Sequence, residues 1–354
     1  GRVQRDWFYT GYGSGGDVKK PYVVNLLEGI RRCEGLALNE ELARIYEAWC
    51  AAHPVNHGVW GHWPRFYPEM PLSKELVRQA SEHSQSAVVV IGRSAGEDRE
   101  NTLKKGSFYL TNKEKALLNA VTAAFQKVVL VLNIGSIMDF AEIDAYGDKI
   151  SAILLAWQLG MESGNAVADV LTGQVNPSGR LTDTIAKTYA DYPAQNFGNK
   201  AENRYTEDIF VGYRYFETFA PERVLYPFGY GLSYTDFACK MKKTEIKDQT
   251  VTVQVQVENT GALPGKQVVQ LYACCPCGAL GKAAKVLIAF GKTEELAPGK
   301  HQTLTLTAPY RHFASFDDSG AAGHKNAWLL EAGDYTFCLG TDVRNAVPCG
   351  DLHL

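Results

Sequence analysis

The loop at residues 92–101, GRSAGEDREN, concentrates groups that could exchange protons. Its charged members are Glu97, Asp98 and Glu100, with Arg93 and Arg99 among them. Cleavage of a glycosidic bond needs one carboxylic acid to protonate the leaving oxygen and a second carboxylate opposite it. The acid needs a raised pKa, which burial and a neighbouring carboxylate can supply. The loop could supply that acid, but for these residues taken alone we favour a solvated loop with local arginine–carboxylate pairs.

A glycine-rich stretch, GYGSGGDV at residues 11–18, precedes a helix that we expect over 22–32. Backbone N–H groups of such loops can bind phosphate. This stretch lacks the lysine of a P-loop and the spacing of a dinucleotide fingerprint. A tight turn that requires glycine explains it equally well.

Glu162 is a second catalytic candidate, in the segment WQLGMESGN at residues 157–165. Carboxylates are favoured near the positive end of a helix, and a helix is predicted over 164–171. We therefore interpret Glu162 as structural.

Histidines and cysteines are the candidate metal ligands. The histidines His53, His57 and His62 lie near Trp60 and Trp63. Their irregular spacing favours packing or stacking against sugars, whose C–H faces are apolar. The cysteine cluster at 274–277 lacks the second pair that a zinc site needs. We expect no metal and no cofactor, and we expect free thiols in a reducing cytoplasm.

Charge and length limit the class of protein. The 354 residues carry a formal net charge of −3, so nothing in the charge balance indicates a nucleic acid or membrane partner. No apolar run reaches the roughly 20 residues of a spanning helix, and no signal peptide is visible at the N-terminus. The length suggests two domains.

Apolar runs predict how the first domain positions these loops. We expect strands over 87–91, 128–132 and 153–156, with helices over 113–125 and 164–171. Alternating strands and helices indicate right-handed βαβ units and an open α/β sheet. Ligands of such sheets lie outside the carboxyl ends of the strands, so the loops after residues 91, 132 and 156 are where we expect chemistry.

The second half follows a different period. Residues 250–257, TVTVQVQV, alternate strictly, and further short strands are predicted over 268–272, 301–306 and 334–339. This pattern indicates an antiparallel β-sandwich. We predict an α/β domain over 1–200, an ordered connecting segment over 201–236 and the β-sandwich over 237–354.

These segments together resemble glycoside hydrolase family 3. The similar stretches include GSGGDV (13–18), VVVIGRSAGEDREN (88–101), AWQLGMESGNAVADVLTGQVNPSGRL (156–181), YPFGYGLSYTDF (226–237) and VQVENTGALPGKQVVQLY (255–272). The resemblance runs along essentially the whole chain. It implies an α/β fold class: an α/β sandwich, with a mostly parallel sheet and flanking helices, followed by an antiparallel fibronectin type III-like β-sandwich.

The resemblance also implies roles for individual residues. Glu97 matches the general acid/base, which in the family's bacterial β-glucosidases lies in a Gly-Glu-Gly-x-Asp-Arg-like loop. Asp98 and Arg99 follow at once, so this loop is shorter, and we expect both to contact substrate. Ser14 matches a serine that contacts the glycone sugar.

The family's nucleophile is an aspartate on a separate TIM-like barrel, often in a Ser-Asp-Trp context that this chain lacks. The resemblance therefore implies part of a retaining β-glucosidase that acts on small β-glucosides or β-linked oligosaccharides, with a barrel domain or chain as partner. Two alternatives stay open. One is a non-catalytic scaffold or binding subunit with the same fold, and the other is a β-xylosidase or β-N-acetylglucosaminidase of the same family.

Overall fold

The computed structural model describes residues 1–16, 18–97, 101–194 and 201–354. The chain forms two compact units, Gly1–Val175 and Asn176–Leu354. The boundary between the units falls before residue 200, where the sequence pattern placed the end of the first domain.

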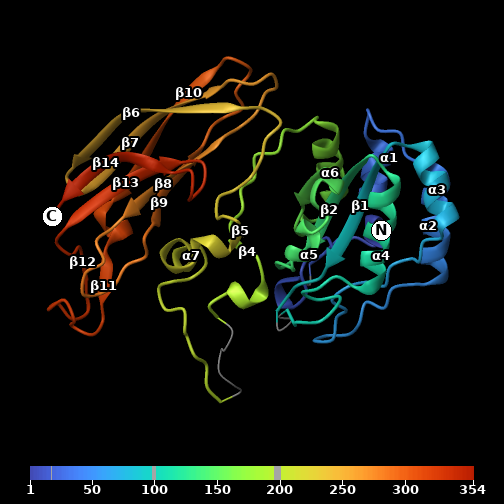
Figure 1. The fold of residues 1–354 in the computed structure, drawn as a ribbon, viewed down its shortest axis with the longest axis horizontal. Helices are drawn as coiled ribbons and strands as arrows, with labels where there is room; N and C mark the ends of the chain where they lie inside the picture. Colours follow the sequence, from blue (N-terminus) through green and yellow to red (C-terminus); the bar gives the residue numbers. More distant parts are fainter. Residues whose placement is uncertain (17, 98–100, 195–200) are drawn as a thin grey trace. The chain divides into compact units, whose positions relative to one another are not determined.

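The first unit is built on a parallel sheet with the strand order β1-β2-β3 (Figure 1). The strands are β1 Ser86–Arg93, β2 Lys127–Ile134 and β3 Ala152–Leu155. The helices are α1 Leu26–Arg32, α2 Glu40–Ala52, α3 Lys74–His83, α4 Asn112–Ala124, α5 Ala141–Asp144 and α6 Ser163–Thr172. The predicted α/β fold class is confirmed, because each of the three apolar runs is a strand and each pair of neighbouring strands is parallel.

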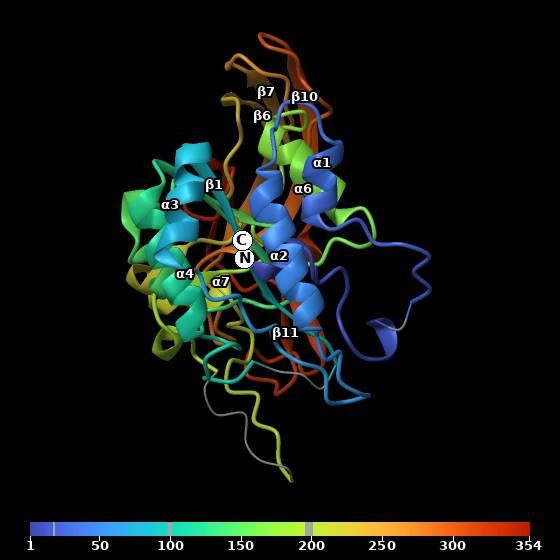
Figure 2. The same cartoon turned by 90° about the vertical axis from the view of Figure 1, so that its right-hand side faces the viewer.

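Helices cover both faces of this sheet, which explains why its strands are continuously apolar. Helices α1 and α6 lie on one side, and α3 and α4 on the other (Figure 2). Val90 and Val131 pack in one cluster with Leu26 of α1 and Val167 of α6. Burial on both faces fixes the strands, and so fixes where the loops at their carboxyl ends begin.

Two helices that the sequence analysis did not predict, α2 and α3, begin at side-chain caps. The side chain of Asn39 accepts the Leu42 N–H at the start of α2. Ser73 accepts the Leu76 N–H in the same way at the start of α3. Such side-chain caps satisfy backbone donors that a helix end leaves unpaired. The helix predicted over 22–32 begins only at Leu26.

The second unit is an antiparallel β-sandwich, as predicted. Its strands are β4 Ile185–Ala186, β5 Val224–Tyr226, β6 Phe237–Lys247, β7 Thr250–Asn259, β8 Val268–Cys274, β9 Val286–Lys292, β10 His301–Pro309, β11 Ser315–Asp317, β12 Ala327–Leu329, β13 Asp334–Gly340 and β14 Val347–His353, and its helix is α7 Tyr213–Phe219. One sheet has the order β10-β7-β6 and the other β14-β13-β8-β9. Alternate valines of β7 pack with Leu271 of β8 and Phe337 of β13 to form the core.

The segment predicted to connect the domains packs within the second unit. Tyr213 and Phe228 stack with ring centroids 4.6 Å apart, and both pack against Tyr272 of β8. The limits at residues 200 and 236 stay predictions. Within the described ranges, no helix is both long and apolar enough to cross a bilayer.

Candidate active site

Glu97 stands just beyond the carboxyl end of β1, in a short stretch that pairs with the glycine-rich loop. The Tyr12 N–H donates to the Ala95 carbonyl at 2.8 Å, and the Glu97 N–H donates to the Tyr12 carbonyl at 3.0 Å. A side chain at Gly96 would collide with the Tyr12 backbone, and one at Gly13 would collide with Glu97. The glycines therefore let two loops, far apart in sequence, lie against each other.

Ser14 meets the Glu97 carboxylate directly. Its backbone N–H donates to Glu97 Oε2 at 2.9 Å, and its hydroxyl donates to the same oxygen at 2.5 Å. The structure thus brings together two predicted site residues. Among the described residues, none donates a hydrogen bond to Oε1.

These contacts hold Glu97 in its charged form. The Ser14 hydroxyl, and after it the Ser14 N–H, lower the pKa of the Glu97 carboxyl below its ordinary value. The side chain is exposed, so burial has little opposing effect. The raised pKa that a general acid needs is therefore not supplied by burial within this chain, because the loop leaves the carboxylate in solvent.

Asp98 and Arg99, the other two predicted substrate contacts, lie outside the described residues, as does Glu100. Their roles stay predictions.

Arg93 anchors the end of β1 rather than pairing within the loop. Its guanidinium binds both carboxylate oxygens of Glu114 on α4, at 2.6 and 2.8 Å. It also donates to the carbonyl oxygens of Ser107 and Gly92. Both charged side chains are buried. A planar guanidinium bound at two oxygens has a fixed orientation, so this pair fixes the point from which the Glu97 loop departs.

Asn133, at the end of β2, ties neighbouring segments to the same sheet edge. Its Oδ1 accepts the Phe8 N–H at 2.8 Å, and its Nδ2 donates to the carbonyl oxygens of Phe8 and Trp157 at 2.8 and 2.7 Å. Trp157 has a φ of 45°, a conformation that costs energy outside glycine. We had not singled out Asn133, although one polar residue in the apolar run VVLVLNI was a signal.

The position of Glu162 before α6 agrees with its structural interpretation, although its side chain does not cap the helix. Its exposed carboxylate accepts the Tyr22 hydroxyl at 2.6 Å and the Asn165 amide at 2.5 Å, immediately before α6. Hydrogen bonds from Tyr22 and then Asn165 lower the pKa of Glu162.

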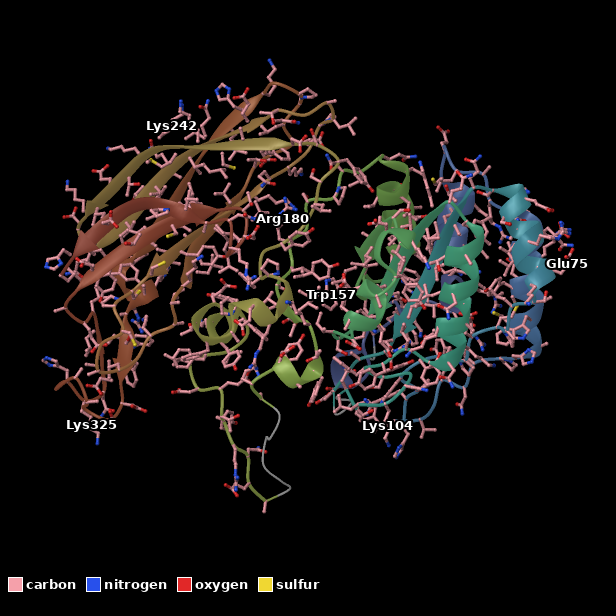
Figure 3. All side chains as sticks on the ribbon, viewed as in Figure 1. Glu75, Lys104, Trp157, Arg180, Lys242 and Lys325 are labelled. Carbon is pink, nitrogen blue, oxygen red and sulfur yellow. The ribbon has the colours of Figure 1, made fainter. Side chains whose placement is uncertain are left out.

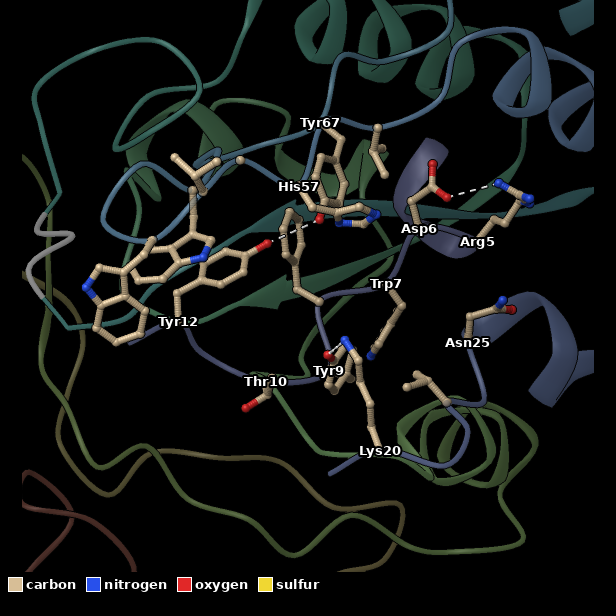
Figure 4. A pocket seen from close by; sticks show the side chains of 17 residues that line it. Arg5, Asp6, Trp7, Tyr9, Thr10, Tyr12, Lys20, Asn25, His57 and Tyr67 are labelled. Atoms are coloured by element: carbon tan, nitrogen blue, oxygen red, sulfur yellow. Dashed lines mark hydrogen bonds and ion pairs between the residues drawn. The ribbon is translucent and has the colours of Figure 1, made fainter. Parts of the chain in front are cut away.

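A cavity of about 540 Å³ adjoins the Glu97 loop through Tyr12. The Tyr12 ring stacks on Trp63 with centroids 5.1 Å apart, and Trp60 packs edge-on against Trp63. Figure 4 shows the Tyr12 hydroxyl pointing toward that of Tyr67, 3.3 Å away, beside His57. Tyr12 therefore contributes its backbone to the Glu97 loop and its ring to an aromatic cavity wall.

Two of the three histidines, His53 and His57, pack against aromatic rings, Trp49 and Tyr67. The His53 ring stacks on Trp49 at 4.4 Å, and its Nδ1 lies 2.9 Å from the Trp49 carbonyl oxygen. His57 lines the cavity. Across the described residues, no three His, Cys, Asp or Glu side chains are grouped to hold a metal ion.

Comparison with known proteins matches both units of the chain. A family described as Glycosyl hydrolase family 3 C-terminal domain matches residues 4–234, and one described as Fibronectin type III-like domain matches residues 267–343.

Two curated relatives and two solved structures show how far the similarity extends. A Ruminococcus albus protein named Beta-glucosidase is 46% identical over 99% of this chain and 37% of its own length. Beta-glucosidase A of Butyrivibrio fibrisolvens is 38% identical over 96% of this chain and 45% of its own. The structure of a β-glucosidase from Paenibacillus barengoltzii has a TM-score of 0.96 at 47% identity, over 99% of this chain and 39% of that one. The structure of β-glucosidase 3B from Thermotoga neapolitana in complex with glucose has a TM-score of 0.88 at 36% identity. The match covers 100% of this chain and 49% of that one.

The chain thus spans less than half the length of each of these four proteins. The family match covers most of the first unit and the connecting segment, and the similar structures cover essentially the whole chain. The resemblance drawn from the sequence motifs is confirmed: the chain belongs to glycosyl hydrolase family 3, as its C-terminal domain followed by a fibronectin type III-like domain.

Proposed function

We propose that this chain is part of a retaining β-glucosidase and supplies its general acid/base, Glu97. The observation that carries the proposal is the Glu97 carboxylate beyond the carboxyl end of β1, held by Ser14 through one oxygen. Relatives named β-glucosidase that match the whole chain support the same activity. The nucleophile comes from a TIM-like barrel that is a separate part of the assembly.

The reaction then runs in two steps. The barrel aspartate attacks the anomeric carbon while Glu97 gives its proton to the departing glycosidic oxygen, which leaves as an alcohol. Glu97, now a carboxylate, takes a proton from water, whose oxygen attacks the same carbon and releases the aspartate. Glucose leaves with retained configuration. The two carboxyl groups must lie about 5–5.5 Å apart, so Glu97 must face the barrel.

The protonation state of Glu97 has to change when the site is completed. In the chain by itself Ser14 lowers the pKa of the Glu97 carboxyl. A second carboxylate nearby and the exclusion of water both raise a carboxyl pKa. We propose that docking of the barrel supplies both effects. Since both Ser14 hydrogen bonds end on Oε2, Oε1 is the oxygen that carries the proton toward the leaving group.

Ser14 would also contact the sugar. Its hydroxyl donates to Glu97 and still has lone pairs that can accept a hydrogen bond from a glycone hydroxyl. The aromatic wall formed by Trp60 and Trp63 is suited to the apolar C–H face of an aglycone.

The test is to assay the 354-residue chain alone, then mixed with a barrel-bearing protein, and then as part of a polypeptide that also contains a barrel domain. The substrates are the p-nitrophenyl β-glucoside, β-xyloside and β-N-acetylglucosaminide. We expect turnover only when a barrel is present and fastest on the glucoside. No turnover in a mixture or in a polypeptide that also contains a barrel domain supports a scaffold, and faster turnover of another glycoside assigns a different sugar.

A further inference from the structure

The second unit contains a cavity of about 320 Å³ between α7, the segment that leads into β9, and the β11–β12 hairpin. The residues on which the inference depends are Arg214, Lys282, Arg311, His312, Phe316 and Trp328. All of them belong to Asn176–Leu354, so the cavity is complete within one unit.

The cavity is positively charged without internal compensation. Arg214, Lys282 and Arg311 line it, and no Asp or Glu is among the described residues that do. None of the three forms an ion pair with any described residue. Among the described residues, the Lys282 ammonium donates to two neutral oxygens, the Phe313 carbonyl at 2.7 Å and the Ser315 hydroxyl at 3.1 Å. Cations gathered in a concave site without carboxylates favour an anionic ligand.

The buried, cationic surroundings lower the pKa of Lys282. Burial first, and the positive charge of Arg214 as well, lower the pKa of its ammonium group, against opposing effects of Cys275 and Glu331. Glu331 is the carboxylate that acts on Lys282, but it accepts the backbone N–H groups of Ala279 and Leu280. A bound anion would relieve the repulsion between Lys282 and Arg214.

Two aromatic rings form one wall. Phe316 of β11 and Trp328 of β12 are directly opposed across the strands, with ring centroids 5.3 Å apart. They are 46% and 52% exposed, which is unusual for a packed aromatic pair. The Arg311 guanidinium lies 5.4 Å from the Trp328 ring centroid, so charge and aromatic surface meet at one point. The β11–β12 hairpin thus gives the β-sandwich an exposed aromatic platform.

The hairpin is held rigidly by a buried carboxylate. Asp317 accepts the backbone N–H groups of Gly320, Ala321 and Ala322 at 2.6, 3.0 and 2.9 Å. This network fixes the loop between β11 and β12 and hence the position of the two rings. A preorganised wall loses little entropy when a ligand binds.

We propose that this cavity binds an anionic saccharide, a pyranose that carries a carboxylate. The carboxylate would lie against Arg214 and Lys282, since guanidinium and ammonium groups bind it by charge-assisted hydrogen bonds. The C–H face of the ring would stack on Trp328. A simple inorganic anion has no apolar face to stack on the aromatic wall, and a neutral sugar has no charge to pair with the cations. The volume is near the lower limit of small-molecule pockets, about 300 Å³, which suits a single sugar ring.

The experiment is calorimetric titration of the 354-residue chain with methyl α-D-glucuronide, methyl α-D-glucoside and sodium acetate. We expect the glucuronide to bind at least tenfold more tightly than either of the others. Arg214→Gln and Trp328→Ala should each weaken it at least tenfold. Glu97→Gln should leave its affinity unchanged.

Lys242→Gln is the matched control, because Lys242 is an exposed cation on β6 that points away from the strand into solvent (Figure 3). It should bind the glucuronide as the unmodified chain does, and thermal melts should show that every variant is folded. Equal binding of acetate, or no effect of Trp328→Ala, would make this an anion site without sugar recognition and overturn the proposal. Equal binding of the glucoside, binding abolished by Glu97→Gln, or no binding at all would overturn it too.

Discussion

Replacing Arg93 by methionine tests whether the buried ion pair anchors the Glu97 loop. The change keeps an apolar stem but leaves the Glu114 carboxylate buried, without the two bonds at 2.6 and 2.8 Å. Removing one partner of a buried pair costs about 3–5 kcal/mol. Glu114 still accepts the Thr111 N–H at 2.7 Å, so we expect the lower end, about 3 kcal/mol. For a unit of this size that lowers the melting temperature by roughly 6–12 °C.

Tryptophan fluorescence during urea unfolding is the assay, because five of the six tryptophans belong to Gly1–Val175. Arg78→Met is the matched control. Arg78 contacts Glu75 and Glu82 on the surface of α3 with more than half of each side chain exposed, so its loss should cost less than about 1 kcal/mol. If Arg93→Met costs no more than Arg78→Met, or if Arg93→Met/Glu114→Met is less stable than Arg93→Met alone, the reasoning is refuted.

Three further changes test the loop and its supports. Gly96→Ala would force the Tyr12 backbone away from the Glu97 loop and lower the free energy of unfolding by about 1–3 kcal/mol. Gly179→Ala is the control, because open space surrounds Gly179, and it should cost much less. Equal melting temperatures of the two variants would contradict this. Asn133→Ala leaves buried backbone groups unpaired and should cost about 2–3 kcal/mol in urea unfolding. Ser14→Ala removes a donor that stabilises the carboxylate, so the pKa of Glu97 should rise. NMR titration of the Glu97 side-chain carboxyl carbon measures it, and a fall or no change in this pKa would contradict the assigned hydrogen bond.

Strands β1 and β2 of the first unit were predictable because most of their residues are buried. The runs at 87–91 and 128–132 have no polar interruption and correspond to β1 and β2. The amphipathic pattern over 113–125 likewise marked α4, whose ends differ by one residue. Helices α2 and α3 were not predicted, although each buries residues at helical spacing, Tyr46 and Cys50 in α2 and Val77 and Ala80 in α3, behind the N-caps Asn39 and Ser73.

The site was harder to predict from the sequence, because its contacts join segments that are far apart along the chain. Ser14 and Glu97 are 83 positions apart, and only the family resemblance singled out both. The partner of Arg93 was sought among neighbouring carboxylates, yet it is Glu114 on a helix that packs against the sheet. Loop composition could not show that Glu97 is exposed and that Ser14 lowers its pKa, since solvent exposure depends on the surrounding fold.

The cationic cavity of the second unit could not be inferred from spacing. Arg214, Lys282 and Arg311 come from three separate segments, and none lies in a run of like charge. Phe316 and Trp328 become one platform only through the register of β11 and β12. Such sites arise from strand pairing, which single-residue patterns do not specify.

The central claim is that Glu97 is the general acid/base, and chemical rescue tests it most directly. In the assembly of this chain with its barrel, Glu97→Ala is assayed on 2,4-dinitrophenyl β-glucoside with and without azide. The good leaving group needs no proton, so the glycosyl-enzyme forms but cannot activate water. We predict that azide restores turnover and gives β-glucosyl azide. An α-glucosyl azide would instead make Glu97 the nucleophile, and wild-type turnover without azide would remove it from the reaction.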